Sequence, residues 1–192
     1  MLNRMIVIVM LSSVAPFLTS CGGRLYKVAP IPAGLPPEIT TGAKGGLSIG
    51  AVALDGQQSY DRFEANLPLA GVIAVDVRMM NRTDTTIATR SLRFELRDPA
   101  GGMLKQLVPK KALGAVMKYY GNKYYAKIAY QRTLEDYESI ALKQDSSIEP
   151  DAEIRGIVFF QTKRETTSID GFILSVAGLT EPVNLQLHTA HK

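Results

Sequence analysis

The run of residues from Gly71 to Asn81 constrains the fold more than any other part of the sequence. Every second residue in it is apolar and able to pack in a core, namely Ile73, Val75, Val77 and Met79. Successive side chains of a β-strand point to opposite faces, so this period of two predicts a strand with one buried face and one more exposed face. Such a strand is stable only when its apolar face packs against another layer of the domain.

Strand patterns recur on both sides of the middle of the chain. An apolar run at residues 47–54 ends at a turn signal, Asp55-Gly56. The polar residues 81–84 separate the first strand from a second alternating run that ends at Leu96, so the two runs predict a β-hairpin. Three more strands are indicated later in the chain, at residues 154–160, 172–176 and 183–187. The first of these is apolar on both faces, which favours a central strand covered on both sides.

Residues 109–142 differ from the rest because they combine helix-forming residues with few helix breakers. A first helix is predicted at residues 110–120, beginning near Pro109 and ending at Gly121-Asn122. A second helix is predicted from an apolar stripe at three- and four-residue spacing, formed by Tyr130, Leu134, Tyr137 and Ala141. We interpret this region as a helical insertion between strands.

The first residues of the chain have the pattern of an export signal. The amino terminus and Arg4 give a short positive segment, and residues 5–18 are almost all apolar. This run is shorter than the roughly 20 residues that cross a bilayer as a helix, but it has the length of a signal sequence. The motif that follows, Leu18-Thr19-Ser20-Cys21, resembles the lipobox of bacterial lipoproteins, in which an aliphatic residue and two small residues precede a cysteine.

The lipobox resemblance implies how the N-terminus is processed. Residues 1–20 would be removed as a signal peptide, with Leu18, Thr19 and Ser20 recognised by the signal peptidase. Cys21 would become the lipid-anchored first residue of the mature chain, and several acyl chains give firm attachment to a membrane. Gly22, in place of an aspartate, implies the outer membrane, with the domain in the periplasm or at the cell surface. A secretory signal without lipid attachment and an uncleaved anchor are the two alternatives.

Residues 21–46 are rich in proline and glycine and predict a spacer. We expect this spacer to hold the folded domain, residues 47–192, away from the membrane. In the alternative, part of the segment packs along the domain as an edge strand through Leu25, Tyr26 and Val28. Cys21 is the only cysteine, so an exported domain has no internal disulfide and depends on its core for stability.

The count of about six to eight short strands with one helical insertion at residues 109–142 predicts a mainly β fold, with an antiparallel sandwich as the natural packing. Hydrophobic residues make up 46% and charged residues 21% of the chain, as in ordinary globular domains. The strand and turn signals at residues 63–81 and 148–160 resemble small immunoglobulin-like domains of bacterial envelope lipoproteins. This resemblance implies an immunoglobulin-like antiparallel β-sandwich with an inserted helical segment, and it implies nothing about function.

No pattern in the sequence predicts a catalytic residue, a metal site or a cofactor. The only histidines, His188 and His191, stand close to the last residue, where a chain usually frays. Phosphate-binding glycine loops and the glycine-flanked serine of hydrolases have no counterpart in the sequence. The net charge of +4 is small, and we expect no nucleic-acid partner.

Tyrosine and lysine concentrate in the helical insertion, where Tyr119, Tyr120, Tyr124 and Lys127 are candidates for a partner interface. Tyrosine is favoured at interfaces because it combines a large apolar area with a polar tip. The partner would be an envelope protein or polymer. Two other interpretations stay open: tyrosines of the insertion cover the core, with the lysines as its solvated fringe, or the cluster contacts lipid headgroups.

These features together predict a lipid-anchored module of the cell envelope that binds or assembles without catalysing a reaction. An accessory subunit of an envelope transport or secretion complex is one alternative. An envelope hydrolase is another, which the terminal position of both histidines disfavours.

Overall fold

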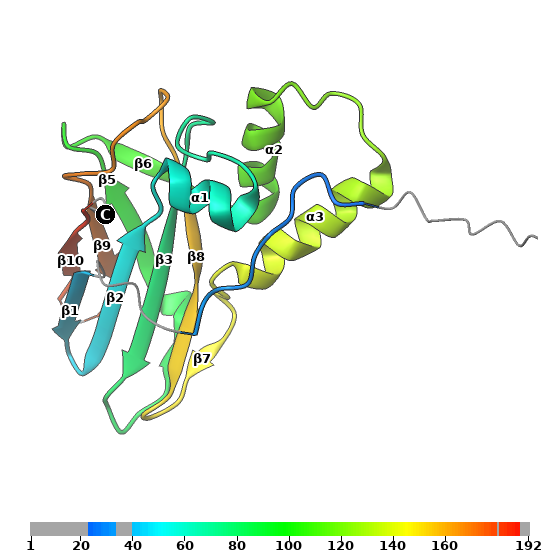
Figure 1. Ribbon diagram of the computed structural model, residues 1–192. Helices are drawn as coiled ribbons and strands as arrows, with labels where there is room; N and C mark the ends of the chain where they lie inside the picture. The colour runs from blue at the N-terminus through cyan, green and yellow to red at the C-terminus, as the bar shows by residue number, and fades with distance from the viewer. Residues whose placement is uncertain (1–22, 34–39, 180, 189–192) are drawn as a thin grey trace, which may run out of the picture.

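The computed structural model describes residues 23–33, 40–179 and 181–188 (Figure 1). The lipobox residues Leu18, Thr19, Ser20 and Cys21 lie outside the described residues, as does His191.

Eight strands form one antiparallel sheet in the spatial order β1-β2-β3-β8-β6-β5-β9-β10. Their bounds are Thr40–Lys44 (β1), Leu47–Ala53 (β2), Val72–Asn81 (β3), Arg93–Arg97 (β5), Met103–Leu107 (β6), Glu153–Gln161 (β8), Ile173–Ala177 (β9) and Val183–Gln186 (β10). The sheet curls until its two edges meet, since β1 contacts β10 and a Cβ on Gly42 would lie 2.8 Å from the Leu185 side chain. The prediction of a mainly antiparallel β fold with helices is confirmed.

The curled sheet encloses the larger hydrophobic core. Ile73, Val75, Val77 and Met79 all point into it with 0% exposure, as the alternating pattern predicts. Leucines, valines and phenylalanines of β5, β8, β9 and β10 fill the core from the other side. The apolar side chains on the inner face of the sheet are therefore buried in this core.

A second core lies on the outer face of β3 and β8, under three helices. These are α1 (Gly56–Phe63), α2 (Pro109–Tyr119) and α3 (Lys127–Ile140). Figure 1 shows them together on one side of the sheet. Val72 and Ala74 of β3 are completely buried there, so the first part of β3 is covered on both faces instead of one. The prediction that β8 is covered on both faces is confirmed. None of the helices in the described part of the chain is long and apolar enough to cross a membrane.

Aromatic rings connect the helices to the sheet in this second core. The ring centroid of Tyr137, on α3, lies 5.0 Å from that of Phe63 on α1 and 5.8 Å from that of Phe159 on β8. Burial raises the pKa of the Tyr137 phenol well above its usual range. Its hydroxyl is buried without a hydrogen-bond partner among the described residues.

Both helices of the insertion form where the sequence predicts them, whereas α1 replaces a predicted turn. Asp55 caps α1: its side chain accepts a hydrogen bond from the Gln58 N–H at 2.7 Å, and the Gln58 side chain accepts one from the Asp55 N–H at 3.1 Å. This reciprocal pair is a capping box, which starts a helix at a position that also suits a turn.

The predicted hairpin between β3 and the following strand is wrong. β3 pairs with β2 and β8, while β5 pairs with β6 and β9. The chain leaves β3 at Asn81, whose buried amide donates hydrogen bonds to the carbonyls of Thr85 and Ile148. The next residues form β4 (Ile87–Ala88), paired with β7 (Ser147–Ile148), and the 3-10 turn η1 (Thr89–Ser91). A hairpin forms instead between β5 and β6. The sequence patterns did not predict strand β6.

Candidate functional site

The four predicted interface residues lie where α2 ends and α3 begins. Tyr119 is the last residue of α2, Tyr120 caps that helix, Tyr124 is in the connecting loop, and Lys127 is the first residue of α3. Tyr119 and Tyr120 are each 42% exposed and Tyr124 is 97% exposed, while Lys127 is also exposed. The structure thus places all four at one end of the helix pair.

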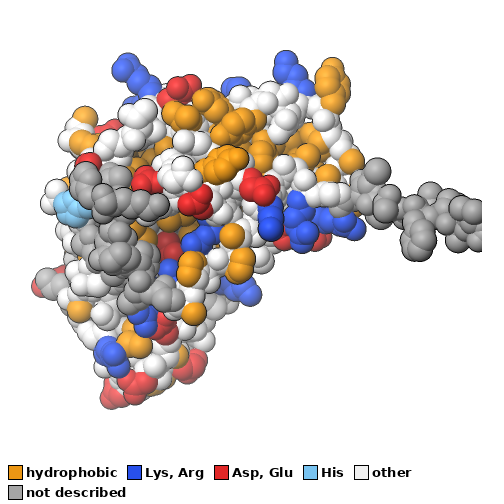
Figure 2. Space-filling view, viewed as in Figure 1, with side chains coloured by type: hydrophobic (Ala, Val, Ile, Leu, Met, Phe, Trp, Pro, Cys, Tyr) orange, Lys and Arg blue, Asp and Glu red, His pale blue; other side chains and the backbone are white. Residues whose placement is uncertain are grey.

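We call the exposed residues of this region the α2–α3 surface: Lys118, Tyr119, Tyr120, Lys123, Tyr124, Tyr125, Lys127 and Ile128. Figure 2 shows hydrophobic and basic side chains projecting together in the upper right of the molecule, over the end of α2 and the loop. Single exposed apolar residues are common, whereas here four tyrosines and an isoleucine are exposed within ten residues of the chain, which makes the region a candidate contact site.

Local contacts hold the base of this surface in place. Gly121 has a positive φ of 69°, which ends α2, and the Asn122 N–H then donates to the Met117 carbonyl at 2.9 Å. The Tyr120 hydroxyl accepts a hydrogen bond from the Asn66 N–H at 2.9 Å. Its ring lies edge-on to that of Tyr119, with 5.0 Å between centroids. These two rings are therefore ordered before any partner binds.

The tyrosines of the insertion divide between two roles. Tyr137 is fully buried in the second core and Tyr130 is partly buried against it, as the core-covering interpretation requires. Tyr119, Tyr120, Tyr124 and Tyr125 are each more than 40% exposed, so covering the core does not account for them.

Charge is strongly asymmetric around the α2–α3 surface. Residues 109–134 contain five lysines and one arginine and no acidic residue, a net charge of +6. The whole chain has +4, so the remainder has −2. All five lysines are exposed. Three of them, Lys118, Lys123 and Lys127, belong to the α2–α3 surface, which favours a negatively charged partner there.

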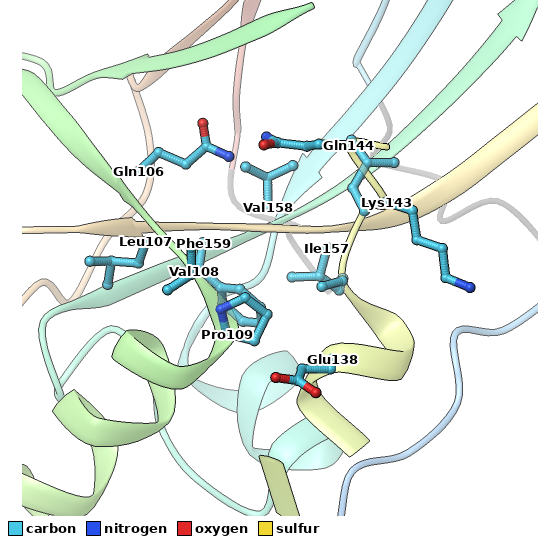
Figure 3. Close-up of a pocket in the computed structure, with 12 residues that line it drawn as sticks. Gln106, Leu107, Val108, Pro109, Glu138, Lys143, Gln144, Ile157, Val158 and Phe159 are labelled. Carbon is cyan, nitrogen blue, oxygen red and sulfur yellow. The ribbon is translucent and has the colours of Figure 1, made fainter. Parts of the chain in front are cut away.

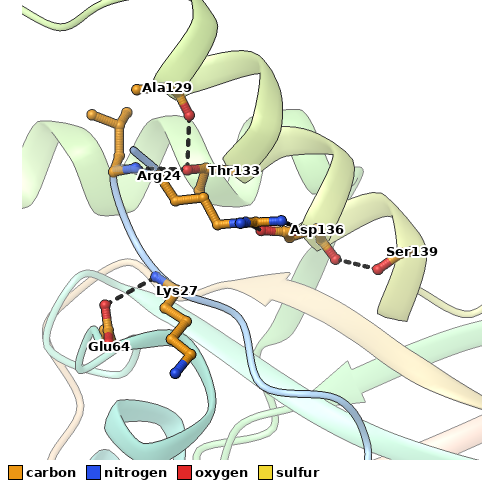
Figure 4. Close-up of polar contacts among 8 residues, drawn as sticks. Arg24, Lys27, Glu64, Ala129, Thr133, Asp136 and Ser139 are labelled. Atoms are coloured by element: carbon orange, nitrogen blue, oxygen red, sulfur yellow. Dashed lines mark hydrogen bonds and ion pairs between the residues drawn. The ribbon is translucent and has the colours of Figure 1, made fainter. Parts of the chain in front are cut away.

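Residues 23–33 run along α3 and α1 instead of forming a spacer (Figure 4). Arg24 forms an ion pair with Asp136 of α3, and the Leu25 N–H donates to the Thr133 hydroxyl at 2.8 Å. The Lys27 N–H donates to the Glu64 carboxylate at 3.0 Å. The packed alternative therefore applies here, although the segment is not a strand. The Tyr26 side chain, 7% exposed in the second core, supplies the apolar contact that a free spacer would lack.

A cavity of about 460 Å³ lies between this segment, α1 and the outer face of the sheet. Asp76 and Arg155 form a bidentate ion pair at its floor, with both N–O distances 2.8 Å. Arg62 of α1 also lines the cavity, and its Nη1 is buried without a hydrogen-bond partner in the described residues. Burial lowers the pKa of the Arg62 guanidinium. The sequence did not reveal this group, because its members come from α1, β3 and β8.

A smaller cavity, of about 210 Å³, lies where β6 diverges from β8 (Figure 3). Its wall is mainly apolar, and Gln106 and Gln144 point toward each other across Val158. Beyond this point the edge of β8 is covered by the chain that follows α3, since the Leu142 N–H donates to the Ile157 carbonyl at 3.0 Å.

In the described ranges, no three or more histidine, cysteine, aspartate or glutamate side chains group closely enough to hold a metal ion. His188 is exposed.

Comparisons with known proteins add little. No protein-family model matches the chain, and no curated protein matches it. A crystal structure of a conserved hypothetical protein from Bacillus anthracis aligns with a TM-score of 0.37 and 11% identity, over 76% of this chain and 92% of that chain. Similarity at this level supports no argument about fold or function.

Proposed function

We propose that this protein is a lipid-anchored lipoprotein of the cell envelope that acts as a non-enzymatic binding or assembly module. Cys21 is its anchor, residues 1–20 are its signal peptide, and the outer membrane is its location. Its contact region is the α2–α3 surface, with Tyr119, Tyr120, Tyr124 and Lys127 among the contact residues. The partner is a component of the envelope.

The observation that carries this proposal is the exposure of the tyrosines at the α2–α3 surface. Large aromatic side chains contribute most of the binding energy in many interfaces, and ordered ones lose little entropy on binding. Tyr119 and Tyr120 are held by their mutual contact and by the hydrogen bond from Asn66. The surface is therefore both exposed and preorganised.

We also propose that the two halves of the sheet form an immunoglobulin-like sandwich. It is supported by the position of β6, which pairs with both β5 and β8 and so divides the sheet into two halves facing each other across the larger core.

Two measurements on the protein purified from its native envelope test the proposal. The intact mass should include a diacylglyceryl group and a further acyl chain on Cys21, and the variant Cys21→Ser should lack both and leave the membrane fraction. A photo-crosslinking amino acid at position 124 should capture an envelope component. The matched position 103, on β6, should not, although Met103 is also well exposed at 56%. An unmodified Cys21 or equal capture from both positions would refute the proposal.

A further inference from the structure

We infer that the α2–α3 surface lies on the lipid bilayer in which Cys21 is anchored, with its tyrosines at the level of the headgroups and its lysines facing anionic lipids. This inference rests on the proposed function, because it takes Cys21 as the attachment point. It names the membrane itself as the partner of the surface.

Only a short length of chain separates the anchor from the folded domain. Four residue steps separate Cys21 from Leu25, so their Cα atoms can be at most about 15 Å apart. Leu25 is fixed to Thr133 of α3 by its backbone hydrogen bond. Lys127 comes six residues before Thr133 on the same helix, or about 9 Å along its axis. The lipid attachment point is therefore tethered to α3, the helix that begins at Lys127.

This attachment also orients the domain relative to the membrane. In Figure 1 the described N-terminal segment begins beside the first part of α3, at the end of that helix that lies away from the sheet. The ion pair between Arg24 and Asp136 fixes the segment in that place. A bilayer reached from there meets the helix layer first, and the sheet is turned away from it.

The residue types exposed on the α2–α3 surface suit a membrane interface. Tyrosine is enriched at membrane interfaces. Its apolar ring packs near the acyl chains, and its hydroxyl forms hydrogen bonds at the level of the headgroups. Tyr124 is 97% exposed and Ile128 is 57% exposed, while Tyr125 is 45% exposed and its ring packs on that of Tyr130. The lysines Lys118, Lys123 and Lys127 stand among them, and no residue of the α2–α3 surface is acidic. Glu165 lies beside Lys118 and Tyr119, but so do Lys163 and Arg164, and the local charge stays positive. The pattern is that of an interfacial contact reinforced by a basic patch.

The chain contains no tryptophan, so one introduced tryptophan is an unambiguous fluorescent reporter. We suggest Tyr124→Trp and, as a matched control on β6, Met103→Trp, each in the full lipidated protein. The proteins are reconstituted in vesicles of phosphatidylethanolamine and phosphatidylglycerol, with or without brominated phosphatidylcholine. Emission from position 124 should shift to the blue and lose intensity when bromine is present, whereas emission from position 103 should change in neither respect.

A charge test uses Tyr124→Trp with Lys123→Gln and Lys127→Gln added. The quenching at position 124 should fall in vesicles with phosphatidylglycerol, and the control pair Lys105→Gln and Lys143→Gln should leave it unchanged. These substitutions change only exposed side chains.

The outcomes separate this inference from the proposed function. Lipid on Cys21 with no quenching at position 124, or with equal quenching at position 103, would overturn the membrane contact and leave the anchored module standing. A protein or polymer captured from position 124 under those conditions would identify the surface as an interface of that class. A Cys21 without acyl groups would remove the premise of both.

Discussion

The backbone N–H of Asn66 donates a hydrogen bond to the hydroxyl of Tyr120 at 2.9 Å, and this contact ties the loop after α1 to the end of α2. Tyr120 therefore has a structural role besides its exposure. Tyr124, which is 97% exposed, contributes mainly to the surface. The two tyrosines should respond differently to substitution.

Tyr120→Phe removes the acceptor for the Asn66 N–H and should lower the free energy of unfolding by about 1 kcal/mol. Tyr124→Phe should change it by less than about 0.5 kcal/mol, as is usual for exposed sites. Urea denaturation of both variants measures the difference. Equal effects would show that the hydrogen bond to Tyr120 contributes nothing to stability.

Gly156 lets the chain after α3 approach β8 closely. A Cβ at this position would lie 2.5 Å from the Leu142 Cα, so Gly156→Ala has to displace backbone and should destabilise the fold by about 1–3 kcal/mol. Gly114→Ala is the matched control, because it lies inside α2 with nothing within 4 Å of the added Cβ. It should stabilise the protein by about 0.5–1 kcal/mol. Thermal unfolding would contradict this account if both variants shifted the midpoint in the same direction.

Substituting the two arginines of the larger cavity should change the free energy of unfolding in different ways. Arg62→Met removes a buried nitrogen that has no partner in the described residues, so stability should stay the same or rise by about 1 kcal/mol. Arg155→Met instead leaves the buried Asp76 carboxylate without its ion pair and should cost about 3–5 kcal/mol. Guanidinium chloride unfolding distinguishes the two, and a large loss for Arg62→Met would show that its guanidinium is paired in solution.

Glu149 links β7 to the loop before β4. Hydrogen bonds from the Thr86 and Ser147 hydroxyls hold the pKa of its carboxyl below the usual range. A carboxyl group whose pKa is lower in the folded chain than in the unfolded chain stabilises the fold at pH values above the ordinary glutamate pKa. This stabilisation is lost as the pH falls through the lowered pKa. Thr86→Val should move the Glu149 pKa back toward its usual value. The carbon chemical shift of the carboxyl, followed by NMR through a pH titration, measures this, and an unchanged midpoint would exclude the Thr86 contact as the main cause.

Local signals explain which elements could be predicted. Pro109 and Gly121 mark the two ends of α2, and the stripe that includes Tyr137 marks the buried face of α3. The capping box of Asp55 and Gln58 was present in the sequence as well, but α1 has only eight residues and its first residue, Gly56, is typical of a turn.

Strand pairing was less predictable because it depends on residues far apart in the chain. The amide of Asn81 bonds to Ile148, 67 positions later, and no local pattern reveals that contact. The same limit applies to the cavity residues Arg62, Asp76 and Arg155. By contrast, the candidate residues Tyr119, Tyr120 and Tyr124 could be proposed from composition alone, although only the structure separates them from the buried Tyr137.

The attachment of residues 23–33 to the helices also determines how the domain responds to mechanical force. Tension applied through the chain before Gly23 is carried first by the contacts of Arg24 with Asp136 and of Leu25 with Thr133. Both contacts transmit the force to α3, and neither pulls directly on a strand. The hydrogen-bond ladder of the sheet is therefore shielded from a pull at this end until the N-terminal segment has peeled away from the helices.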